Sequence, residues 1–205
     1  RPSRPGDVLH RPQDVPALSP DTGLSREERA RVYGELVRTR SRIDGMRRVG
    51  GPGLYAVFLD PAVALPDVTA AEDGLLYVGG TDSLEEELLD VHFKTGKSGL
   101  SVLRRTLGAL LKHELDLTAI PRGNSVKDKD PALFKFRQEG MLSQWMARSL
   151  RVAAAVGSDL QDEETRFVAD YHPPLNREGW KNPTTPRIDA LLEACRVEAP
   201  TGMKA

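Results

Sequence analysis

Apolar and polar positions follow two different periods along the chain, and these periods predict its helices and strands. Apolar residues spaced three or four positions apart share one face of a helix. They predict helices at residues 24–49, 83–93, 101–114, 139–147, 159–170 and 186–198. Short runs that are continuously apolar or alternating predict strands. These strands are expected at residues 54–59, 75–78, 134–136 and 150–156.

The first predicted helix has a clear beginning and a basic outer face. Ser25 followed by Glu28 has the pattern of a capping box. Arginines outnumber acidic residues on the outer face and include Arg38, Arg40 and Arg42. This face is either an ordinary solvated surface or a surface that contacts the phosphate backbone of a nucleic acid.

Prolines and glycines divide the chain into parts. Five prolines lie within residues 1–23, where apolar periodicity is weak, so we expect an extended arm over the surface or a flexible lead-in there. The helix at 24–49 is followed by a Gly-Gly-Pro-Gly run that opens the main domain, residues 50–198. Residues 199–205 form a tail. Within the main domain, residues 121–131 are expected to form a polar loop.

Composition limits the class of protein. With 205 residues, of which 39% are apolar, the chain can bury the core of one domain. Its net charge of −1 gives no overall attraction to nucleic acid, so any such binding has to use a local patch. Cys195 is the only cysteine, which excludes an internal disulfide and fits a reducing, cytoplasmic compartment.

Other destinations and cofactors have no support in the sequence. No apolar run is long enough to span a membrane, and no signal peptide is visible, so we expect no membrane partner. The four histidines and the single cysteine lack the spacing of a zinc site. Because the sequence starts at Arg1 rather than Met, we expect a trimmed chain or a part of a longer protein.

Two neighbouring predicted strands each carry a tyrosine beside a glycine. Residues 53–55 read Gly-Leu-Tyr, and residues 77–79 read Tyr-Val-Gly. The helix expected at residues 83–93 follows closely. Two tyrosines on adjacent strands, next to the start of a helix, indicate a compact polar site on a sheet.

These motifs resemble the two signature motifs of the GIY-YIG nuclease family, and the resemblance covers roughly residues 50–195. Segments that resemble one bacterial branch of the family follow in the correct order, at His92-Phe93, Gly96 to Ser98, Leu103 to Gly108, Ile120 to Gly123, Phe134 to Phe136, Trp145-Met146 and Pro173 to Asn176. The resemblance implies an α+β fold in which a small mixed or antiparallel sheet is flanked by helices. The helix at 24–49 is then an N-terminal extension.

The resemblance also implies which residues carry the chemistry. Tyr55 acts as general base on a water or positions it, and Tyr77 is the second tyrosine. Glu164 holds one divalent metal, Mg²⁺ or Mn²⁺, against the scissile phosphate, where a metal ion offsets the growing negative charge. Asn176 supports the site. A tyrosine has a reference pKa of about 10, so it acts as a base near neutral pH only if a nearby cation lowers that pKa.

Two positions depart from the family pattern. Gly80 stands where the family normally has a basic residue, and Glu87 stands where it has an arginine that meets the phosphate. Since a glutamate repels a phosphate, three explanations are open. Other basic residues reach the phosphate instead, or the domain binds DNA without cutting it, or Glu87 is an inactivating substitution in this sequence. The candidate replacements are Arg104, Arg105, Lys94 and Lys97.

The helix at 83–93 leaves two further questions open. Its leucines are expected to face the core, with Glu85, Glu86 and Glu87 on the opposite side. His92, near its end, is either a structural residue or a member of the site.

One main hypothesis and two alternatives follow. The main hypothesis is a metal-dependent DNA endonuclease that serves restriction, defence or repair. The first alternative is a catalytically impaired module of the same fold, which binds DNA through its basic first helix, or binds a partner protein or a second copy of itself. The second alternative is an interaction protein whose acidic helix at 83–93 faces a basic partner.

Overall fold

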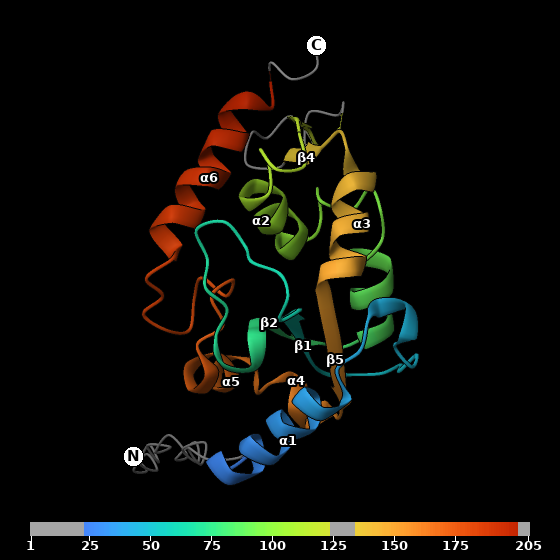
Figure 1. Ribbon diagram of the computed structural model, residues 1–205. Coiled ribbons are helices and arrows are strands. Elements are labelled where there is room, and N and C mark those ends of the chain that lie inside the picture. Colours follow the sequence, from blue (N-terminus) through green and yellow to red (C-terminus); the bar gives the residue numbers. More distant parts are fainter. Residues whose placement is uncertain (1–22, 124–133, 201–205) are drawn as a thin grey trace, which may run out of the picture.

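A three-stranded antiparallel sheet forms the centre of the protein (Figure 1). The computed structural model describes residues 23–123 and 134–200. The sheet contains β1 (Gly53–Leu59), β2 (Leu75–Thr81) and β5 (Leu150–Val156), in the order β2-β1-β5. Every residue of β1 is buried, because this strand is paired on both sides. The expected α+β fold, with helices around a small antiparallel sheet and a helix at the N-terminal side, is confirmed.

Helices cover both faces of the sheet, and alternate residues of β1 face two different cores. The helices are α1 (Arg26–Thr39), α2 (Val102–Leu110), α3 (Glu139–Ser149), α4 (Ser158–Gln161), α5 (Glu164–Tyr171) and α6 (Thr185–Glu198). Leu54, Ala56 and Phe58 pack into a core formed with residues of α1, α4 and α5. Tyr55 and Val57 pack into the other core, with residues of α2, α3 and α6. In Figure 1, α1 accordingly lies at the opposite end of the molecule from α2 and α6.

The first helix begins as predicted and ends earlier. Ser25 Oγ accepts the Glu28 N–H, and the Glu28 carboxylate accepts the Ser25 N–H at 2.8 Å, so the capping box is present. The prediction that the helix runs through residue 49 is wrong, because α1 ends at Thr39. Beyond it, the backbone of Ser41 pairs with Val152 on the outer edge of β5, which holds this segment extended.

The helix after β2 contains a wide turn. A π-helical segment, η3, runs over Glu86–His92, and the N–H of Phe93 bonds the carbonyl of Leu88 at 2.9 Å. Because a π-helix closes its hydrogen bonds over five residues, residues i and i+5 come together. Glu87 therefore turns towards His92, and the prediction that it lies opposite the core is wrong.

Two smaller elements differ from the sequence-based expectation. β4 (Phe134–Phe136) pairs with a short unpredicted strand, β3 (Ala119–Pro121), in a separate two-stranded sheet. The helix expected at 159–170 is divided into α4 and α5, so Glu164 stands in the first turn of its own helix.

Some predicted segments lie outside the described residues. These are the arm at 1–23 except for Gly23, most of the tail at 199–205 and most of the loop at 121–131. Within the described part, no helix has the length and apolar character that crossing a membrane requires.

Candidate functional site

The two signature tyrosines lie side by side because a glycine leaves room between them. Tyr55 on β1 is paired in register with Gly79 on β2. A Cβ at Gly79 would stand 2.4 Å from the Tyr55 ring, so any larger residue there would displace the tyrosine. The centroids of the Tyr55 and Tyr77 rings are 6.1 Å apart. The glycine of the second motif thus makes space for the tyrosine of the first.

His92 holds the hydroxyl of Tyr55 from the side of η3. Its Nε2 lies 2.6 Å from the Tyr55 oxygen, and its Nδ1 lies 2.7 Å from Ser101 Oγ. A carboxylate oxygen of Glu87 is 3.2 Å from the same Nε2. His92 is therefore joined to the tyrosine pair on one side and, through the N-cap residue Ser101, to α2 on the other. Of its two possible roles, the structure places it against Tyr55.

Burial decides the charge state of this group. It raises the pKa of Tyr55 well above its usual value and that of Tyr77 to about 12, with Glu87 and Glu164 adding to both shifts. Burial, followed by the charge of Arg104, lowers the pKa of His92 to about 4. At neutral pH both phenols are therefore protonated and the imidazole is neutral. Burial also raises the pKa of Glu87.

Glu164 and Asn176 meet the tyrosines along the free edge of β2. The Asn176 side chain accepts the Val78 N–H at 2.9 Å and donates to the Val78 carbonyl at 2.8 Å, much as a neighbouring strand would. One oxygen of Glu164 accepts the Gly80 N–H at 2.8 Å. Both side chains thus satisfy backbone groups that an edge strand otherwise leaves unpaired.

A cavity of about 420 Å³ opens beside this edge. Its wall includes Tyr77, Glu164, Asn176 and Arg177. Tyr55 is not part of this wall and is only 2% exposed, so it is buried beside Tyr77 and does not open onto the cavity. The cavity therefore brings together three of the residues that the resemblance singled out.

The backbone explains why position 80 carries no basic side chain. A Cβ at Gly80 would stand 2.1 Å from the carbonyl oxygen of Gln161, at the end of α4. A lysine or arginine would require α4 to move away from β2.

The donor set of the cavity suits a metal that needs few protein ligands. Among the described residues, no three His, Cys, Asp or Glu side chains are grouped closely enough to hold a metal ion. A zinc site, with its three or four protein ligands, does not fit. Mg²⁺ is commonly bound through one or two carboxylates, with waters and substrate phosphate completing its shell. Glu164 therefore fits a site of this second kind.

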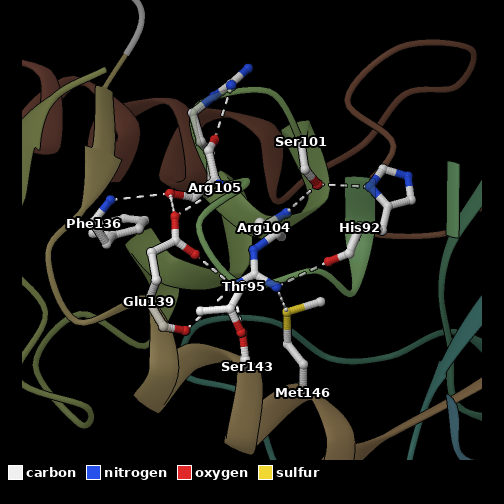
Figure 2. Close-up of polar contacts among 10 residues, drawn as sticks. His92, Thr95, Ser101, Arg104, Arg105, Phe136, Glu139, Ser143 and Met146 are labelled. Carbon is white, nitrogen blue, oxygen red and sulfur yellow. Dashed lines mark hydrogen bonds and ion pairs between the residues drawn. The ribbon is translucent and has the colours of Figure 1, made fainter. Parts of the chain in front are cut away.

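Arg104 is buried and is not part of the cavity wall, and Figure 2 shows its polar contacts. It is fully buried, with Nη2 2.6 Å from a Glu139 carboxylate oxygen and Nη1 bonded to the His92 carbonyl at 3.1 Å. Met146 and Ser143 are further contacts. In this position it braces His92 and faces no open space. Glu139 was not predicted as part of this region, although a buried arginine is expected to have a carboxylate partner.

The other candidate basic residues lie in three places. Arg105 donates to the Ser98 carbonyl at 3.1 Å, near the cavity. Lys94 pairs with Asp90 at 3.0 Å on the exposed side of η3. Lys97 lies in the turn before α2.

The basic residues of the first helix are not brought to the site. Arg38 pairs with Glu35 on the surface of α1. Arg40 bonds the Asp73 carbonyl and lies over the ring of Phe58, which faces the core opposite Tyr55. Arg42 is exposed beyond the end of α1. None of these three arginines is part of the cavity wall.

A small antiparallel sheet with paired tyrosines, a carboxylate and an asparagine at its edge defines an α+β protein with a polar site beside that edge. The family model described as the GIY-YIG catalytic domain matches residues 53–198. The chain therefore belongs to the GIY-YIG family, a nuclease-type family. A search of the curated proteins found no significant match, and neither did a search of the solved structures.

Proposed function

We propose that the protein is a metal-dependent DNA endonuclease that hydrolyses phosphodiester bonds. The observation that carries this proposal is the convergence of Tyr77, Glu164 and Asn176 on one cavity, with Tyr55 and His92 directly behind them. Restriction, defence or repair are the uses we propose for such an activity, and a cytoplasmic location suits all three.

Each residue has a proposed task. Glu164 would hold Mg²⁺ or Mn²⁺ through its carboxylate, one oxygen of which accepts the Gly80 N–H. When bound, such an ion supplies a Lewis acid that offsets phosphate charge and lowers the pKa of a coordinated water. Asn176 keeps the edge of β2 straight beside the cavity.

The tyrosines stay protonated and serve to position other groups. Since their pKa values are raised, both phenols keep their protons at neutral pH and act as hydrogen-bond donors. Tyr77 faces the cavity and orients the attacking water or a phosphate oxygen. Tyr55 fixes Tyr77 from behind and is itself fixed by neutral His92.

The test is cleavage of labelled duplex DNA with Mg²⁺ or Mn²⁺, compared with the same reaction in a chelator. Tyr55→Phe and Glu164→Gln are run beside the wild type. Metal-dependent products from the wild type alone support the proposal. No cleavage with any divalent metal overturns it.

One observation favours a second candidate, a module that binds DNA without cutting it. Glu87 places a carboxylate beside His92, where negative charge opposes the approach of a phosphate. This candidate predicts salt-sensitive DNA binding with no turnover, also after Glu87→Arg. Recovery of cleavage in that variant would exclude it.

A further inference from the structure

Three arginines from separate segments converge beside the cavity. Arg177 is part of the cavity wall, and so is Val102, at the start of α2. Arg105 follows Val102 by one turn of the same helix. Arg122 follows β3, and its Cγ is 2.7 Å from where a Cβ on Gly99 would stand, so its aliphatic stem rests on that glycine.

A buried ion pair fixes the direction of Arg105. The Glu139 carboxylate that binds Arg104 also accepts the Ser98 N–H at 2.9 Å and bonds the Ser98 hydroxyl. The carbonyl of the same Ser98 accepts Arg105 Nη1 at 3.1 Å. Figure 2 shows the result, with Arg104 pointing toward Ser143 and Met146 and Arg105 pointing the other way. A guanidinium held in place loses less conformational freedom when it binds a ligand.

The three guanidinium groups lie close enough to repel one another. Burial, and then the charges of Arg122 and Arg177, lower the pKa of Arg105, which shows that the three cations act on one another. Arg177 pairs with Asp189 at 2.6 Å, but both side chains are exposed, by 39% and 50%. An exposed pair of this kind is weak and exchanges readily for another anion. Three mutually repelling guanidinium groups therefore gain from an added polyanion.

We propose that Arg105, Arg122 and Arg177 form a phosphate-binding cluster for the backbone of DNA. The inference rests on the proposed function, because the bound strand is the one that reaches Glu164 in the neighbouring cavity. Guanidinium groups bind phosphate oxygens through paired, charge-assisted hydrogen bonds, which suits a backbone contact that does not depend on base sequence.

The experiment measures DNA binding without cleavage. A fluorescent duplex is titrated with protein in chelator at several salt concentrations, using Arg105→Gln, Arg122→Gln and Arg177→Gln. We expect each to weaken binding about tenfold, as for the loss of one charge-assisted bond. We also expect the slope of log K against log salt to fall by about 0.9 for each lost phosphate contact. Arg148→Gln is the control, because this exposed arginine bonds within its own helix, α3.

A variant that is expected to strengthen DNA binding adds a second test. Asp189→Asn removes the partner of Arg177, so the proposal predicts DNA binding about threefold tighter than in the wild type. Thermal unfolding followed by circular dichroism verifies each fold. Should Arg105→Gln unfold, the exposed Arg177→Gln still decides the matter. Wild-type affinity and salt slope in Arg177→Gln would overturn the proposal, and so would the absence of DNA binding at low salt.

Failure of the inference differs from failure of the proposed function. DNA that is bound through the cluster but never cut supports the phosphate-binding cluster and contradicts the endonuclease activity. If Arg105→Gln and Arg177→Gln cut DNA normally and bind it with unchanged affinity, the phosphate-binding cluster is contradicted and the endonuclease activity is supported.

Discussion

The hydroxyl oxygen of Tyr55 lies 2.6 Å from Nε2 of His92, 37 residues further along the chain. The contact joins the central strand β1 to the end of η3. It depends on the wide π-helical turn, which brings His92 and Glu87 to the same side. Ser101 holds the other ring nitrogen, so the imidazole has a fixed orientation beneath the tyrosine pair.

Tyr55→Phe removes the oxygen that His92 binds and keeps the ring. We expect cleavage to fall at least about 100-fold, because Tyr77 and the bound water lose a fixed neighbour. The free energy of unfolding should fall by only about 1–2 kcal/mol, the cost of a buried unpaired group. Cleavage assays and urea unfolding measure the two effects. Tyr33→Phe, on the opposite side of the sheet, is the control and should leave cleavage unchanged.

Glu164→Gln separates metal binding from folding. The amide oxygen of glutamine can still accept the Gly80 N–H, so the protein should unfold at nearly the wild-type temperature. Metal-dependent cleavage should fall by about 1,000-fold, since the one carboxylate proposed to hold the ion is gone. Glu178→Gln changes an exposed carboxylate on the same cavity and is the matched control. Loss of cleavage in Glu178→Gln but not in Glu164→Gln would show that Glu164 does not hold the metal.

Glu87→Gln tests the effect of negative charge beside the tyrosines. The carboxylate is one of the charges that raise the pKa values of Tyr55 and Tyr77, so both values should fall in the variant. With less repulsion of phosphate, cleavage should rise about tenfold. Ultraviolet titration of the tyrosines and the cleavage assay measure these changes. The neighbouring Glu86→Gln should change neither the tyrosine pKa values nor cleavage. Lower cleavage in Glu87→Gln would contradict the prediction.

The buried pair of Arg104 and Glu139 is expected to matter for stability. Glu139→Ala leaves a fully buried guanidinium without its carboxylate and should lower the free energy of unfolding by about 3–5 kcal/mol. The double variant Arg104→Met, Glu139→Leu should recover much of this loss. Asp90→Asn, which breaks an exposed pair with Lys94, should cost less than about 1 kcal/mol. Equal losses in Glu139→Ala and Asp90→Asn, measured by urea unfolding, would argue against a structural role.

Acid should destabilise the protein through His92. Its pKa is lowered to about 4 in the folded state, against about 6.5 when unfolded, so the unfolded chain binds the proton first. This contribution to stability is complete above pH 6.5 and is lost progressively between about pH 6.5 and 4. Between pH 7 and 5 it amounts to about 2 kcal/mol. The pH dependence of urea unfolding measures it, and His92→Gln should remove this part of the slope.

Much of the fold could be predicted from local pattern. Alternating and continuous apolar runs located β1 and β5, and Ser25 with Glu28 located the start of α1. Two features of the fold could not be predicted in this way, because they depend on partners far along the chain. The helix stops at Thr39 because Ser41 pairs with Val152, and Phe134–Phe136 joins a second sheet because its partner is Ala119–Pro121.

The sequence by itself determined the family and the residues that its motifs single out, since these depend on residue type and order. The tertiary structure decided what surrounds them. It turned Glu87 towards His92, buried Arg104 against Glu139 and left Arg105 beside the cavity. Each outcome depends on the burial of a charged or polar group against a partner distant in sequence, and no local pattern encodes that. The position of the tyrosine pair follows from sequence, and its electrostatic surroundings follow only from the folded chain.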